Sequence, residues 1–127
     1  MRKAALVLLP LALSACAGQD QALAAADRIP AATPAGEPRQ CIPLPIRESR
    51  VRSDQVIDFI GRGGQAYRVT LPQPCPGLGF ERRFTYATSL NQLCAQDIVT
   101  VLYIGGGPAR GASCGLAPFQ PVTLPRR

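Results

Sequence analysis

Cysteine spacing constrains this chain more than any other feature of its sequence. Four of the five cysteines are widely spaced across residues 41–114, no two of them form a C-x-x-C motif, and the chain has no histidine. Structural zinc sites use closely spaced ligand pairs, and thioredoxin-like redox centres and c-type haem need C-x-x-C. The spacing therefore predicts disulfide bonds among Cys41, Cys75, Cys94 and Cys114, with no metal site and no cofactor.

The first residues predict export. Residues 1–3 are a short basic start, and residues 4–13 are an apolar run with one proline. This run is too short to span a bilayer, which needs about 20 apolar residues. The pattern is typical of a cleaved signal peptide, here over residues 1–15. Export would place the four later cysteines in an oxidising compartment, where disulfides persist.

Cys16 follows the apolar run and has its own explanation. Residues 13–16, Leu-Ser-Ala-Cys, resemble the lipobox of bacterial lipoproteins. The resemblance implies cleavage before Cys16, a diacylglyceryl group on its thiol, and an outer-membrane location facing the periplasm because Ala17 follows. The alternative is ordinary signal cleavage at a small-x-small site, at residues 15–17 or 24–26. Cys16 would then be discarded, and the protein would be soluble in the periplasm.

Residues 16–40 differ in composition from the rest. They contain no aromatic residue, few large apolar ones, and prolines at 30, 34 and 38. Such a segment cannot bury enough apolar surface to offset its ordering entropy. The sequence therefore predicts a flexible, lipid-anchored tether over 16–40 and a folded domain over 41–124. A domain of this size has a marginal core and is expected to need covalent staples.

Period-two alternation in the domain is typical of strands. We expect a small all-β domain, an antiparallel meander or partial barrel of about five to six strands, stapled by disulfides. A hairpin turn is expected at GRGG, residues 61–64, and one helical turn at 89–96. Residues 46–52 are charged and fit an edge, and two prolines confine 118–124 to an edge or an irregular segment. The remaining strands are expected at 53–60, 65–71, 83–88 and, as a central strand, 97–104.

A meander also favours one disulfide pairing. Successive connections lie at alternate ends of the sheet, so Cys41 and Cys94 fall at one end and Cys75 and Cys114 at the other. A disulfide needs Cα atoms within about 7 Å, whereas a five-residue strand is about 17 Å long. We therefore expect Cys41–Cys94 and Cys75–Cys114, a choice that cysteine positions alone do not make.

Candidate catalytic residues are few. Without histidine, the Ser-His-Asp and Cys-His arrangements are excluded. Carboxylates remain, and Asp54 and Asp58 would share a face if both lay on one strand. Nothing beyond residue type marks an acid–base pair. The domain acids are Glu48, Asp54, Asp58, Glu81 and Asp97.

Arginines alternate with aromatic residues between Tyr67 and Tyr86, and every basic residue after Lys3 is an arginine. Export argues against nucleic acid as a partner, and core aromatics opposite solvated arginines explain the alternation. We expect an exported lipoprotein that is a structural or binding module without catalysis. Its expected partners are the membrane, through lipid on Cys16, and an envelope protein or anionic glycan. The alternatives are an envelope enzyme or accessory subunit using carboxylates, or a binder of anionic glycans or lipid headgroups.

The motifs CPGL, residues 75–78, and LCAQDI, residues 93–98, resemble a family of small exported proteobacterial proteins to which no activity is attached. The resemblance covers about residues 41–122. It implies a β-rich exported domain with four cysteines. It implies no activity, so no site residues carry over.

Overall fold

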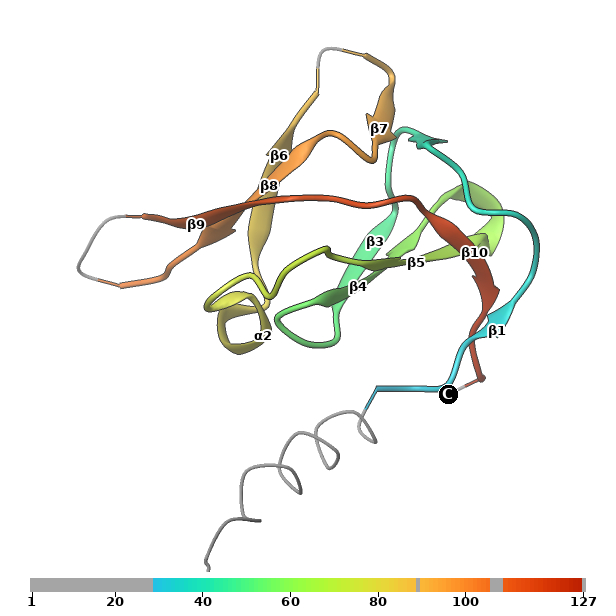
Figure 1. Ribbon diagram of the computed structural model, residues 1–127, viewed down its shortest axis with the longest axis horizontal. Coiled ribbons are helices and arrows are strands. Elements are labelled where there is room, and N and C mark those ends of the chain that lie inside the picture. Colours follow the sequence, from blue (N-terminus) through green and yellow to red (C-terminus); the bar gives the residue numbers. More distant parts are fainter. Residues whose placement is uncertain (1–28, 89, 106–108, 127) are drawn as a thin grey trace, which may run out of the picture.

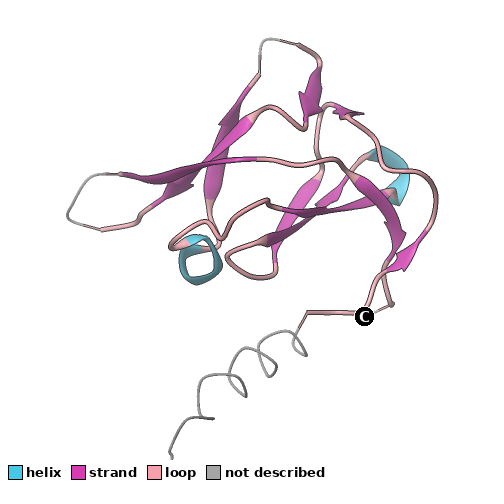
Figure 2. Ribbon diagram, in the orientation of Figure 1, coloured by secondary structure: helices cyan, strands magenta, loops and turns pink. Residues whose placement is uncertain are grey.

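The computed structural model describes residues 29–88, 90–105 and 109–126. They form ten short strands in three antiparallel sheets, with one short α-helix (Figures 1 and 2). The predicted all-β class, antiparallel pairing and disulfide stapling are confirmed, and the sheets do not close into a barrel. The predicted signal peptide, Cys16 and the first part of the predicted tether, 16–28, lie outside the described residues.

The largest sheet has the strand order β1-β10-β5-β4-β3. Strands β3, β4 and β5 form a meander. The predicted hairpin turn at 61–64 joins β4 to β5, and Gly63 and Gly64 have φ values of +77° and +81° there. As its charges predicted, β3 lies at an edge. The bounds are β1 Thr33–Pro34, β3 Glu48–Val51, β4 Val56–Ile60, β5 Ala66–Thr70 and β10 Gln120–Thr123.

Strand β10 is not at an edge, contrary to the expectation from its prolines. It pairs with β5 on one side and β1 on the other. The Ala35 N–H donates to the Pro121 carbonyl at 2.9 Å, so the bonding side of Pro121 faces β1. The missing N–H of this proline therefore weakens only the pairing with a two-residue strand, which is how β10 tolerates it.

The folded domain begins earlier than the predicted boundary at Cys41. Strand β1 pairs Thr33 with Thr123, and Arg39 exchanges two backbone hydrogen bonds with Phe119, at 2.7 and 2.8 Å. The last part of the segment predicted to be a flexible tether is therefore held on the sheet. The amino-acid composition did not predict this attachment, because the hydrogen bonds that hold the segment are made by the backbone and need no apolar side chain.

The other two sheets are smaller. Strand β8, Ile98–Leu102, is central between β6, Phe84–Ala87, and β9, Arg110–Gly115, as the sequence predicted. Strand β2, Cys41–Pro43, pairs with β7, Gln92–Cys94. Residues 92–94, within the segment 89–96 that was expected to contain a helical turn, are thus a strand. Helix α2, Leu78–Glu81, follows the proline-rich loop after β5.

The core is made of buried side chains from all three sheets. Tyr67, Val69 and Leu71 are buried on one side of β5 and just beyond it, as their alternation predicted. Phe59 is at its centre and contacts two rings edge-on, Phe84 with centroids 6.0 Å apart and Phe119 at 5.7 Å. This core fixes the sheets relative to one another and leaves loops, strand edges and outer faces for function.

Candidate functional site

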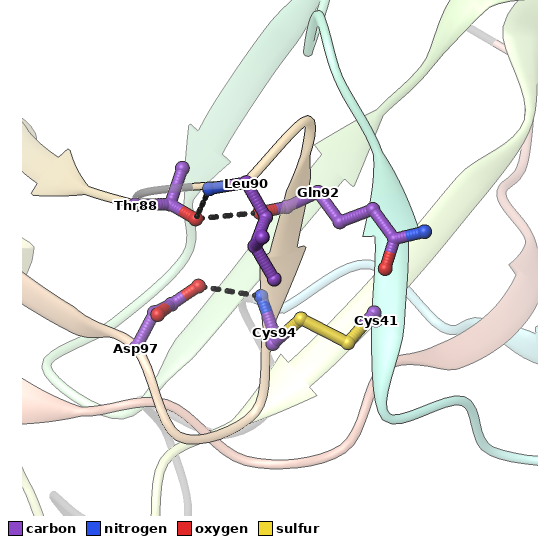
Figure 3. The surroundings of a disulfide bond; sticks show 6 residues. All are labelled: Cys41, Thr88, Leu90, Gln92, Cys94 and Asp97. Carbon is purple, nitrogen blue, oxygen red and sulfur yellow. Dashed lines mark hydrogen bonds between the residues drawn. A yellow bond between two sulfur atoms is a disulfide. The ribbon is translucent and has the colours of Figure 1, made fainter.

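The two disulfides have the expected pairing, Cys41–Cys94 and Cys75–Cys114. Cys41 and Cys94 are directly opposed on β2 and β7, with Cα atoms 4.0 Å apart (Figure 3). The flanking hydrogen bonds, Ala95 N to Gln40 O and Leu44 N to Asn91 O, place them at a non-hydrogen-bonded position, where opposed residues come closest. The pairing of β2 with β7 therefore brings these two cysteines together. A simple meander does not include this pairing.

Asp97 closes the turn between β7 and β8. Its carboxylate accepts a hydrogen bond from the Cys94 backbone N–H at 2.7 Å (Figure 3), and its own N–H donates to the Cys94 carbonyl at 3.0 Å. These two hydrogen bonds fix the backbone of Cys94, one of the two cysteines of the disulfide. Asp97 is thus a turn residue, as its place before β8 suggested.

Asp54 has a similar structural role at the turn between β3 and β4. Its carboxylate accepts a hydrogen bond from the Gly79 N–H in α2 at 2.7 Å, and its carbonyl accepts one from Cys75 at 2.7 Å. A Cβ at Gly79 would lie 3.0 Å from the Asp54 backbone nitrogen, so only glycine fits without a shift. Asp54 therefore holds α2 and the Cys75 disulfide against the first sheet.

Asp58 lies in a row of charges on the outer face of the first sheet. Arg50, Asp58 and Arg68 are opposed across β3, β4 and β5. The Asp58 carboxylate accepts hydrogen bonds from Arg68 Nε at 2.7 Å, Arg68 Nη2 at 3.0 Å and Arg52 Nε at 2.8 Å. Asp58 is fully buried because these arginine side chains cover it.

The protonation of Asp58 follows from this setting. Burial opposes its ionisation, but the hydrogen bonds from Arg68 and Arg52 outweigh burial and lower the pKa of the carboxyl. A carboxylate that stays ionised and has no exposed oxygen is not suited to proton transfer. Asp54 and Asp58 are therefore not an acid pair: one is an exposed turn residue and the other is buried under arginines.

An exposed apolar patch lies at helix α2 and the β8–β9 hairpin. Phe80 in α2 is 88% exposed and Ile104 is 66% exposed, although the sequence predicted that the aromatics of this segment belong to the core. Tyr103 joins the two elements, because a Cβ built on Gly77, next to α2, would lie 3.1 Å from the Tyr103 hydroxyl. The patch could not be predicted from the positions of apolar residues in the sequence, because the exposure of a side chain depends on tertiary packing.

Three exposed arginines follow α2 or flank Leu102, at the end of the sheet where Ile104 is exposed. Arg82 ends α2 with φ +55°. The Arg83 carbonyl accepts a hydrogen bond from Leu102 at 3.0 Å, and Arg110 is opposed to the same Leu102. None of the three forms an ion pair with the described residues. We call this set the α2–hairpin surface; its members are Phe80, Arg82, Arg83, Tyr103, Ile104 and Arg110.

Residues 29–88, 90–105 and 109–126 contain no group of three or more Cys, Asp or Glu side chains placed to hold a metal ion. In the same residues no helix has the length and apolarity needed to cross a bilayer. Comparison with protein-family models, curated proteins and solved structures finds no match to this chain. The family resemblance noted above stays a prediction.

Proposed function

We propose that this chain is an exported lipoprotein of the bacterial envelope, anchored through Cys16 and acting as a structural or binding module. The observation that carries the proposal is the disulfide pairing. The two bridges use all four cysteines of the folded domain, so Cys16 has no cysteine partner left within the chain. In an exported protein, acylation in a lipobox is then the best explanation for this thiol.

Acylation would give a strong anchor. Each buried methylene of an acyl chain contributes about 0.8 kcal/mol, and more than one chain is needed for stable attachment. Residues 16–28 separate Cys16 from the described domain, and a segment of this length reaches at most about 45 Å when fully extended. The domain is therefore proposed to work close to the outer membrane, on its periplasmic side.

The hydrogen bonds of the carboxylates support a module that binds rather than catalyses. Asp54, Asp58 and Asp97 each accept hydrogen bonds that hold turns or strands together, and Glu48 pairs with Arg50 at 2.6 Å. The rival proposal, an envelope enzyme using carboxylates, would need these groups free for substrate. Its test is turnover that Asp54→Asn or Asp97→Asn abolishes while the fold is retained.

The mass of the mature protein tests the anchor. We expect the protein purified from membranes to begin at Cys16, to carry the added mass of a diacylglyceryl group and an amide-linked acyl chain, and to contain two disulfides. Cys16→Ser should remove that mass and leave the protein out of the membrane fraction, whereas Ala17→Ser should keep both. An unacylated wild-type chain cleaved after residue 26 would show that the protein is soluble in the periplasm.

A further inference from the structure

We propose that the α2–hairpin surface docks on anionic phospholipid headgroups of a membrane. This inference deepens the proposed function, on which it rests for the presence of a membrane beside the domain. It assigns to the folded domain a second membrane contact, separate from the lipid on Cys16.

Apolar side chains of the α2–hairpin surface are strongly exposed. Leu78, in the same helix, is fully buried in the core, whereas Phe80 projects into solvent and is 88% exposed. Ile104 is 66% exposed, just beyond β8. Tyr103 lies between the two elements, with its ring over Gly111 and its hydroxyl beside Gly77. Two large apolar side chains therefore protrude at one end of the molecule.

The α2–hairpin surface is also positively charged. Arg83, just before β6, and Arg110, at the start of β9, both flank Leu102, so the two arginines lie at the end of the sheet where Ile104 is exposed. Arg82, two residues after Phe80, is a third exposed arginine. The acids of this region are Glu81, Asp54 and Asp97, the last of which lines the same surface depression as Arg110. The Asp54 and Asp97 carboxylates already accept the Gly79 and Cys94 N–H groups. Exposed cations without ion pairs in the described residues thus lie at the same end of the sheet as the apolar side chains and complement an anionic surface.

The backbone of Arg82 is a third, independent observation. Its φ of +55° is the only positive φ among the non-glycine residues that the structure describes. A helix commonly ends with glycine in this conformation, because other side chains are disfavoured there. An unfavourable conformation of this kind is often associated with function. Here the residue in that conformation is an exposed arginine directly after α2, the helix that carries Phe80.

The combination favours a bilayer over the other anionic partners. A sugar polymer would pair with the arginines and could stack on the Phe80 ring, but it offers no apolar environment for the aliphatic side chain of Ile104. Membrane-surface contacts combine aromatic and aliphatic side chains, which enter the boundary between headgroups and acyl chains, with arginines that pair with lipid phosphates. In Figure 1, α2 and the start of the described chain both lie toward the lower side of the view, so a membrane below the domain is compatible with both contacts.

The test uses tryptophan fluorescence, since the chain has no tryptophan of its own. Phe80→Trp, in the mature protein mixed with vesicles, reports the surroundings of α2. With phosphatidylglycerol vesicles we expect a blue shift of Trp emission and quenching by brominated acyl chains. With phosphatidylcholine vesicles we expect the emission of a solvated indole. The matched control is Leu90→Trp, at a residue that is 63% exposed and beyond the other end of β6.

Charge variants test the arginines in the same assay. Arg82→Gly suits the backbone of that position and should preserve the fold; it is combined with Arg83→Gln. Each arginine near an anionic surface contributes about 1 kcal/mol, so the pair should raise the lipid concentration needed for half the blue shift about 30-fold. Arg83→Lys alone should change it little.

The outcomes separate this inference from the anchor. Flotation of the protein with phosphatidylcholine vesicles reports the acyl groups on Cys16, whereas the Trp spectrum reports the α2–hairpin surface. Emission that is identical on both vesicle types would overturn the membrane contact, whether or not the protein floats. So would an equal blue shift for Leu90→Trp, or a shift produced only by an added envelope protein or glycan.

Discussion

Asp58 and Arg68 are directly opposed across β4 and β5, and two hydrogen bonds of 2.7 and 3.0 Å join their side chains. Arg52 donates a third hydrogen bond to the same carboxylate, at 2.8 Å. One buried carboxylate thus ties the end of β3 to β4 and β5. The arginines remain partly exposed, with 19% and 17% of their side-chain surface accessible, so they link the buried charge to solvent.

Removing this carboxylate should destabilise the domain strongly. Asp58→Asn keeps the shape of the side chain but leaves two partly buried guanidinium groups without a counter-charge. Breaking a buried pair in this way costs about 3 kcal/mol. The measurement is the free energy of unfolding in urea, with disulfides intact. Glu37→Gln, at an exposed acid, is the control and should change the free energy by less than about 0.5 kcal/mol; similar values for the two variants would contradict a structural role for Asp58.

The same carboxylate should make stability depend on pH. The pKa of Asp58 is lowered in the folded chain, because the hydrogen bonds from Arg68 and Arg52 outweigh burial, whereas in the unfolded chain it is about 3.9. The stabilisation is complete above that value and is lost as pH falls through the lower folded pKa. The difference in free energy of unfolding between wild type and Asp58→Asn should therefore be constant near neutral pH and shrink below about pH 4. A difference that grows in acid would refute this assignment.

Each disulfide should contribute a large part of the stability. The bridges join residues 53 and 39 positions apart, and they overlap along the chain. Loops of these lengths correspond to about 4 kcal/mol each in the chain-entropy model. Paired Cys→Ser variants, one for each bridge, should lower the free energy of unfolding by about that amount in non-reducing buffer. A loss below about 1 kcal/mol for either variant would show that its bridge is dispensable.

Two glycines of β9 give a matched test of the hairpin. A Cβ at Gly111 would lie 2.5 Å from Tyr103 Cε2, whereas a Cβ at Gly115 would meet nothing within 4 Å. Gly111→Ala should displace the Tyr103 ring and lower the free energy of unfolding by about 1 kcal/mol. Gly115→Ala should be neutral or slightly stabilising. Equal effects in urea unfolding would mean that Tyr103 does not pack over Gly111.

Much of the fold was predictable where side-chain alternation reports burial directly. Tyr67, Val69 and Leu71 read as one strand face and are buried. Residues 92–94 were expected to be part of a helical turn. The strand that they form was not predicted, because three residues are too few to show period-two alternation. What defines it is pairing with β2, which lies far away in sequence.

The candidate site was less predictable for a different reason. Asp58 has the sequence context of a solvated strand residue, and only the arginines from β5 and from the end of β3 bury it. Phe80 has the composition of a core residue, and only the placement of α2 exposes it. In both cases exposure is set by neighbours that a local pattern does not contain.

The pairing of Thr33 with Thr123 and the bridge from Cys41 to Cys94 together determine how the chain responds to tension on its N-terminal side. A pull there would first peel β1 and the residues up to Gln40, a segment of 29–40 that extends to about 40 Å. At Cys41 the load passes through the sulfur bridge to Cys94, so residues 42–93 stay in a closed loop. The N-terminal segment is thus a short compliant element in series with a loop, residues 42–93, that a pull cannot extend while the bridge is intact.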